Sequence, residues 1–235
     1  MVTIAHVGSK IIGTPTLGLR GLVLWLKFNE GSGNIAYDSS FYNNHGTIYG
    51  AVYTDGKFGK ALSFDGVDDY VEVPAFQIGT NKISIIAWAK YANDAPDWSP
   101  IIAQRVIAGQ ITTMMVNSEG KPRFEVMGED VTESLYFHGT THVRDNEWHF
   151  WAMTYDGHTL KGWIDLVYQG SREGAVGKIK VVREWYVGWD YDWANRYMKG
   201  LIDEVRIYNR ALSEEEIRML YYQRLGAVLS KEITS

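Results

Sequence analysis

The 235-residue sequence contains no cysteine. This absence excludes a disulfide framework, a thiolate zinc site and a cysteine nucleophile. Positive charge is also scarce, because 23 lysines and arginines stand against 28 aspartates and glutamates, which gives a net charge of −5. Such a balance argues against a nucleic-acid partner, which needs clustered basic residues.

Hydrophobic runs are short as well. No segment approaches the roughly 18 consecutive apolar residues of a transmembrane helix, so we expect no membrane insertion. Residues 1–16 contain one lysine and a weak apolar stretch that Gly8 and Gly13 interrupt. They lack the charged segment and the continuous apolar segment of a secretory signal, so we expect no signal peptide in this chain.

What the sequence does contain is ordinary globular composition with many aromatic residues. Hydrophobic residues make up 46% of the chain and charged residues 22%, which excludes a disordered chain and permits a sizeable core. The chain has nine tryptophans and fifteen tyrosines. This content favours β-strands and binding sites lined by aromatic rings.

Short alternating segments recur roughly every 8 to 14 residues, with turn-forming residues between them. The expected strands are 22–28, 62–64, 70–73, 83–91, 101–105, 112–117, 123–127, 148–155, 160–166, 185–188 and 201–208. Asp156-Gly157 predicts a hairpin turn between two of them. This pattern is typical of an all-β fold, an antiparallel β-sandwich, with residues 1–20 as an N-terminal arm and the sandwich over 21–212.

The C-terminal part, residues 213–235, differs from the rest. Ser213 precedes three glutamates and then an apolar stripe formed by Ile217, Leu220 and Leu225. A serine N-cap followed by acidic residues favours the start of a helix. We therefore predict a short helix over about 214–225 that packs on the sandwich, followed by a tail.

Several stretches carry a family resemblance. They are GLVLWLKFNEGSG (21–33), DGKFGKALSFDGVDDYV (55–71), DNEWH (145–149), TYDG (154–157) and GLIDEVRIYNRALS (200–213). In this order they resemble the laminin-G-like jelly roll of the concanavalin A-like lectin and glucanase superfamily. The resemblance implies a jelly-roll topology. It also implies a sugar-binding or adhesion role, often with bound calcium, and members occur beside enzymes and in virion proteins.

One loop is rich in oxygen donors, which calcium prefers. It offers Glu30, Asp38 and Asn43. The resemblance implies that the first and last strands are neighbours, which would bring Asp203 to the same loop as a fourth ligand of a structural calcium ion. The alternative is that Asp38 and Asn43 form Asx-turns and that Asp203 accepts backbone hydrogen bonds. For the second acidic run, 65–69, turn chemistry explains every residue, so we predict a tight turn.

A group of aromatic and polar residues is the strongest candidate for ligand binding. Trp189, Asp190, Tyr191 and Trp193 fall close together in the sequence, and Trp98 lies in a second candidate loop. Sugars stack their C–H faces on aromatic rings and hydrogen bond to planar polar groups, which these residues supply. Contact with a protein partner and simple packing remain alternatives.

No catalytic residues are predicted. A glycosidase needs two facing carboxylates, and the Glu214–Glu216 run falls on the predicted helix start. Two functions therefore remain open. The first is a non-catalytic carbohydrate-binding or adhesion module with a glycan or cell-surface protein as partner. The second is a self-assembling structural protein of a virion or cell surface. Both imply an extracellular or virion-surface location.

Overall fold

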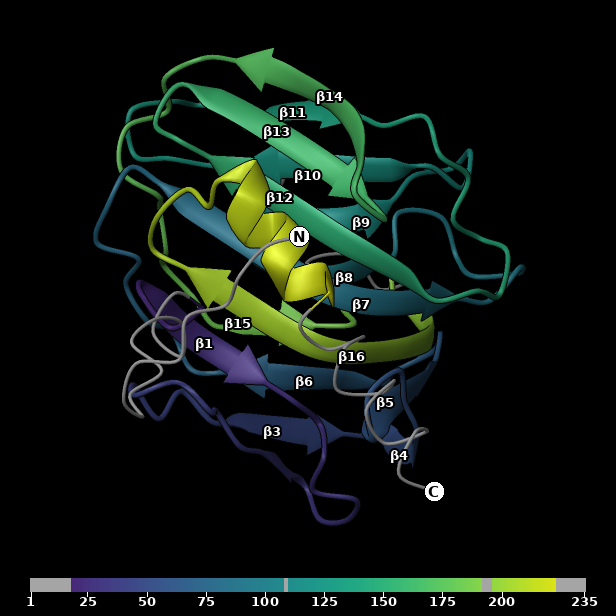
Figure 1. The fold of residues 1–235 in the computed structure, drawn as a ribbon. Coiled ribbons are helices and arrows are strands. Elements are labelled where there is room, and N and C mark those ends of the chain that lie inside the picture. Colours follow the sequence, from purple (N-terminus) through teal and green to yellow (C-terminus); the bar gives the residue numbers. More distant parts are fainter. Residues whose placement is uncertain (1–17, 108–109, 192–195, 223–235) are drawn as a thin grey trace, which may run out of the picture.

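The computed structural model describes residues 18–107, 110–191 and 196–222, which form two antiparallel sheets packed face to face (Figure 1). The first sheet has the order β14 (Val167–Glu173), β13 (Thr159–Ile164), β12 (His149–Tyr155), β7 (Ile83–Tyr91), β16 (Lys199–Tyr208), β5 (Lys60–Asp65) and β4 (Val52–Asp55), and β1 (Leu22–Leu26) also pairs with β16. The second sheet has the order β11 (Leu135–His138), β10 (Pro122–Val126), β9 (Gln110–Val116), β8 (Pro100–Ile107), β15 (Trp185–Val187), β6 (Tyr70–Val73), β3 (Gly46–Tyr49) and β2 (Ile35–Ala36). The predicted antiparallel jelly-roll sandwich is confirmed.

Each strand expected from sequence alternation is present, and five further strands, β2, β3, β4, β11 and β14, were not predicted. The missed strands are short or lie at sheet edges, where few side chains are buried. In β14, for example, one residue of seven is buried. The predicted hairpin joins β12 and β13, with Gly157 at φ 101° in the turn. An edge strand therefore lacks the apolar alternation that makes central strands recognisable.

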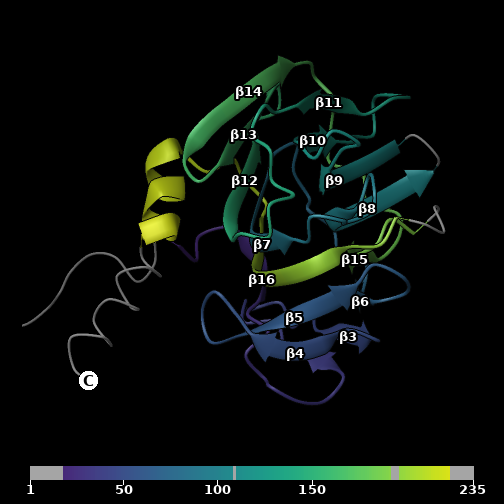
Figure 2. The ribbon, with the colours of Figure 1, turned by 90° about the vertical axis from the view of Figure 1, so that its right-hand side faces the viewer.

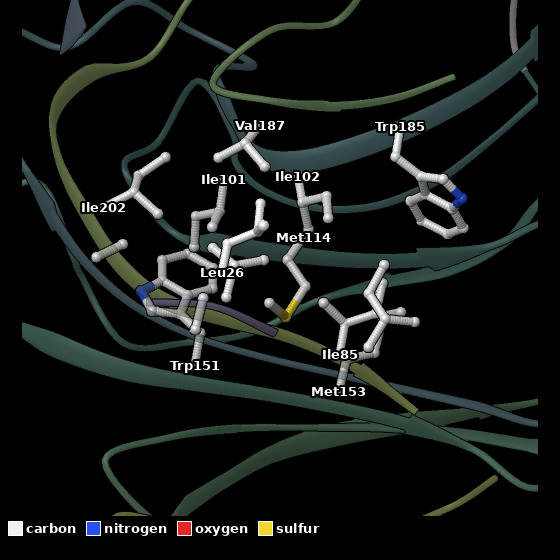
Figure 3. Packing of buried hydrophobic residues seen from close by; sticks show 14 of the residues in the cluster. Leu26, Ile85, Ile101, Ile102, Met114, Trp151, Met153, Trp185, Val187 and Ile202 are labelled. Carbon is white, nitrogen blue, oxygen red and sulfur yellow. The ribbon is translucent and has the colours of Figure 1, made fainter. Parts of the chain in front are cut away.

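The main core lies between the two sheets (Figure 3). From the first sheet, Trp151 and Ile85 point inward, toward the second sheet, which contributes Met114 and Trp185 to the same core. Trp185 and Val187 of the expected strand 185–188 are fully buried. This core fixes which side chains of each strand face outward.

The first and last strands are neighbours, as the family resemblance implies. β16 pairs with β5 along its first residues and with β1 along its last ones. Between these two stretches, Glu204 adopts a φ of 55°, and the pairing of β16 with β7 is irregular between Asp203 and Arg206. This irregularity allows β16 to pair with both β5 and β1 along the same edge.

The C-terminal helix, residues 214–222, covers the outer face of the first sheet (Figure 2). It begins with a capping box, in which the Glu216 N–H donates to Ser213 Oγ at 3.2 Å and the Ser213 N–H donates to Glu216 Oε2 at 2.9 Å. Ile217 and Leu220 pack with Trp88 and other residues of that face. The predicted helix is confirmed to residue 222, and Leu225 lies outside the described residues.

The two ends of the sequence are described in part. Residues 1–17 of the expected arm and 223–235 of the expected tail lie outside the described residues. Within the described part, the Gly18 carbonyl accepts a hydrogen bond from Tyr208 Oη at 3.0 Å, and Leu19 packs with the residues beneath the helix. None of the described helices is long and apolar enough to cross a membrane.

Candidate functional site

The outer face of the second sheet carries a group of side chains that alternation keeps out of the core. Register places Arg105 beside Ile111, and Met115 beside Arg123, on β8, β9 and β10. Their sequence neighbours Met114 and Phe124 point the other way, into the core. In the part of the chain that the structure describes, no helix covers this outer face, whereas the C-terminal helix covers that of the first sheet (Figure 2).

A cavity of about 220 Å³ opens on this face. We call it the arginine pocket, and its lining residues are Trp98, Arg105, Ile111, Met115, Arg123, Glu125 and Arg196. Its apolar part is a small cluster of Ala103, Ile111 and Met115, against which Trp98 packs. The pocket therefore combines an aromatic ring and an apolar floor with charged groups.

Trp98 reaches the pocket from the loop between β7 and β8. Its φ is 60°, in the left-handed region that is uncommon for a large side chain. The guanidinium carbon atoms of Arg123 and Arg196 lie 5.7 Å and 5.8 Å from the centre of its ring system. The indole therefore lies close to two positive charges.

Asp190 lies behind the pocket and binds Arg105 and Arg196. It is fully buried, and both of its oxygens accept hydrogen bonds from Arg105, through Nε and Nη2. Its Oδ2 also accepts a hydrogen bond from Arg196 Nη1 at 3.0 Å. Asp190, one of the predicted ligand-binding residues, thus directs both of its oxygens toward two arginines of the pocket.

Arg123 is held by a second set of contacts. Its Nε donates to Glu125 Oε2 at 2.7 Å, and its guanidinium lies 3.6 Å from the centre of the Tyr136 ring. Nη1 lies 3.1 Å from His138 Nε2. Burial raises the pKa of Glu125 above its ordinary value, although Arg123 opposes this shift. Burial and the charge of Arg123 lower the pKa of His138, which favours a neutral imidazole that accepts a hydrogen bond from Arg123.

Trp189 and Tyr191 belong to an aromatic cluster beside the pocket, which we define as Tyr70, Tyr186, Trp189, Tyr191 and Tyr197. Trp189 stacks on Tyr197 at 5.3 Å with an interplanar angle of 4°. Register places Tyr186 next to Ala103, which joins the cluster to the pocket floor. Tyr191 is 40% exposed, whereas Trp189 is partly buried among four rings, so packing explains part of this group.

The predicted ligand-binding residues thus fall into three positions. Trp98 lines the arginine pocket, Asp190 lies behind it, and Trp189 and Tyr191 lie in the aromatic cluster. Trp193 lies outside the described residues. Arg105 and Arg123 were missed because they come from two different strands, β8 and β10. Alternation along β10 places Arg123 and Glu125 on one face, which was the available signal.

The predicted calcium ligands do not form one group. Among the described residues, three carboxylates that lie close enough to share an ion are found at Asp65, Asp68 and Asp69, and not at Glu30, Asp38 and Asp203. Asp203 is buried and accepts a hydrogen bond from the Phe58 N–H at 2.9 Å. The calcium ion and its four expected ligands therefore stay a prediction.

In the loop that contains Glu30 and Asp38, the carboxylates accept hydrogen bonds from backbone N–H groups. Asp38 accepts hydrogen bonds from the N–H groups of Trp25 and Ser40, each at 2.8 Å, and Glu30 accepts one from the Tyr37 N–H at 2.8 Å. Asn43 adopts a φ of 56° in the same loop. This is the turn chemistry that the alternative interpretation expected for Asp38.

The acidic run 65–69 forms the predicted turn between β5 and β6. Asp65 Oδ1 accepts hydrogen bonds from the N–H groups of Val67 and Asp68, at 2.7 Å and 3.4 Å. Asp69 Oδ2 accepts one from the Asp65 N–H at 2.9 Å. The three carboxylates are thus brought together by the turn itself.

Comparison with known proteins identifies the fold. Residues 65–218 match the family model described as the concanavalin A-like lectin/glucanases superfamily. No curated protein sequence matches the chain significantly. Many solved structures match it, all of those compared below at less than 25% identity, which establishes likeness of fold.

Three of these structures illustrate the range. The binding domain of Paraclostridial Mosquitocidal Protein 1 has a TM-score of 0.67 and 16% identity, over 87% of this chain and 52% of that one. The binding domain of botulinum neurotoxin DC in complex with SialylT has a TM-score of 0.66 and 14% identity, over 88% of this chain and 52% of that one. Domain 4 of the extracellular arabinanase AbnA from Geobacillus stearothermophilus, in complex with arabinotriose, has a TM-score of 0.64 and 20% identity. The match covers 83% of this chain and 96% of that one. The chain thus spans about half of each toxin domain and nearly all of the arabinanase domain.

Proposed function

Because the chain belongs to the concanavalin A-like lectin/glucanase superfamily, we propose that it is a non-catalytic carbohydrate-binding module whose glycan lies in the arginine pocket. One observation carries this proposal. The outer face of the first sheet is covered by the C-terminal helix, whereas the outer face of the second sheet holds a cavity with an aromatic wall, an apolar floor and fixed polar groups. This combination is typical of a small-ligand site.

Trp98 gives the pocket its stacking surface. A sugar ring on an indole removes apolar area from water at roughly 25 cal/mol per Å², so one ring contributes about 1–2 kcal/mol. Affinity for a single sugar should therefore be modest, in the micromolar to millimolar range. The arginines and Glu125 supply the polar partners that select among sugars.

The structural neighbours support the proposal through their own ligands. One is an arabinanase domain in complex with arabinotriose, and another is a toxin binding domain in complex with SialylT. We infer by analogy an extracellular role for this chain, with a glycan or a glycan-bearing cell-surface protein as its partner. The described acidic groups of the pocket are engaged with arginines, which favours binding over hydrolysis.

Replacing Trp98 with alanine should weaken glycan binding roughly 5- to 30-fold, since one ring contributes about 1–2 kcal/mol. The melting temperature should change little, because the indole is partly exposed and lies on the outer face. A glycan array followed by titration of the best saccharide measures this. Phe41, which is 84% exposed in a distant loop, provides the matched control. Phe41→Ala should bind as the wild-type chain does, and unchanged binding by Trp98→Ala would exclude the pocket.

The same two variants separate glycan binding from self-assembly. If the outer face of the second sheet were an interface between subunits, Trp98→Ala would lower the mass measured by light scattering after size exclusion. We expect instead that both variants and the wild-type chain have the same mass. A dissociation caused by Trp98→Ala would favour the structural-protein function.

A stabilising calcium ion stays part of the proposal, and its support is the family resemblance with the oxygen-rich loops. An ion that binds the folded chain alone raises stability by mass action. The melting temperature should therefore be higher in millimolar calcium than in excess chelator. Equal melting temperatures, with no calcium found by elemental analysis, would remove the ion from the account.

A further inference from the structure

The arginine pocket is positively charged in a chain whose net charge is −5. Its lining holds three guanidinium groups and one carboxylate, that of Glu125. With buried Asp190 included, the positive groups still exceed the negative ones by one. Burial also raises the pKa of Glu125. An excess of positive charge attracts an anionic ligand, whereas it gives a neutral sugar no comparable attraction.

From this arrangement we propose that the pocket recognises an acidic saccharide, one that carries a carboxylate, such as a sialic acid or a uronic acid. The inference rests on the proposed function and specifies its ligand class. A carboxylate matches the planar fork of a guanidinium and can accept two parallel hydrogen bonds from it.

The three arginines differ in depth. The Arg105 side chain is 3% exposed, and it forms an ion pair with the fully buried Asp190. The side chains of Arg123 and Arg196 are 16% and 23% exposed, so these two are within reach of a ligand. Their guanidinium carbon atoms lie 5.7 Å and 5.8 Å from the centre of the Trp98 ring system. A sugar stacked on the indole would therefore present its carboxylate to one of them.

Both reachable arginines are held in place before a ligand arrives. Arg196 is fixed by Asp190 at 3.0 Å. Arg123 is fixed by Glu125 and by the Tyr136 ring, and in the described part of the chain its Nη2 makes no hydrogen bond to protein. Because the side chains are already ordered, a ligand loses less binding energy to their immobilisation.

The test compares each acid with its own methyl ester by NMR titration of the full chain. The probes are the methyl α-glycoside of N-acetylneuraminic acid and methyl β-glucuronide, which distinguish the two sources of a carboxylate. At least one free acid should bind about tenfold more tightly than its ester, since a charge-assisted hydrogen bond is lost on esterification. Added salt should reduce that difference.

Two variants assign the difference to the pocket. At least one of the variants Arg123→Gln and Arg196→Gln should remove most of the preference for the acid, because it lowers the affinity for the acid more than the affinity for the ester. Arg172→Gln, at an exposed arginine of β14 in the first sheet, is the matched control and should retain the preference. Melting curves verify that each variant is folded, and the acid–ester comparison on the wild-type chain needs no variant.

The outcomes separate this inference from the proposed function. Equal affinities for acid and ester in both pairs would overturn the acidic-saccharide inference, while sugar binding itself would stand. A preference for the acid that survives both arginine variants would overturn the assignment to this pocket. Absence of binding by every probe would overturn the inference, and the glycan array would then decide the proposed function independently.

Discussion

Asp190→Ala should lower the free energy of unfolding by about 3–5 kcal/mol, because it leaves buried arginine charge without its counter-charge. Asp190 is fully buried, and its two oxygens hold Arg105, whose side chain is 3% exposed. Arg196 depends on the same carboxylate at 3.0 Å. Sugar binding should be lost together with stability, since two of the pocket arginines lose their anchor.

Chemical denaturation of the purified chain measures this effect. Asp97→Ala is the matched control, because Asp97 forms a surface ion pair with Arg144 at 2.8 Å and its side chain is 56% exposed. That variant should unfold close to the wild-type midpoint. An Asp190→Ala chain as stable as the Asp97→Ala chain would show that the buried pair does not organise the pocket.

Ile217→Asp should have a comparable effect through the opposite face of the sandwich. Ile217 is 1% exposed and packs with Trp88, Phe150 and Leu220 between the C-terminal helix and the first sheet. Removing its side chain alone should cost about 2–5 kcal/mol, and burying a carboxylate in its place adds to that cost. We expect the helix to leave the sheet and expose an apolar face that promotes aggregation.

Denaturation followed by light scattering at rising concentration measures both consequences. Arg218→Asp introduces the same side chain at the next position, which is exposed, and should remain stable and monodisperse. If Ile217→Asp melts and scatters as Arg218→Asp does, the helix does not cover the sheet in the way described. Sugar binding by any folded fraction of Ile217→Asp should persist, because the arginine pocket lies on the other sheet.

The local sequence pattern was sufficient to predict the central strands and the helix. In β12 and β7 the apolar residues are dense enough to be recognised without a partner, and Ser213 with Glu216 forms a cap within four residues. β4 and β14 lie at sheet edges and bury little, so their pairing depends on neighbours that the sequence does not identify. Central elements are thus locally encoded, whereas edges are completed by tertiary contacts.

The sequence predicted some residue types of the candidate site but not how these residues are arranged. Trp98 was selected because aromatic rings bind sugars, and it lines the pocket. Asp190 was selected as a polar partner for a ligand, yet it binds Arg105 and Arg196. The arginines converge from β8, β10 and the loop before β16, a convergence that only the sheet order reveals.

A crystal structure of the chain with a bound saccharide tests the central claim most directly. We expect the sugar ring on Trp98, on the outer face of the second sheet, with its polar groups toward Arg123 and Arg196. A saccharide bound instead at the acidic turn 65–69, or at the loop around Asp38, would contradict it.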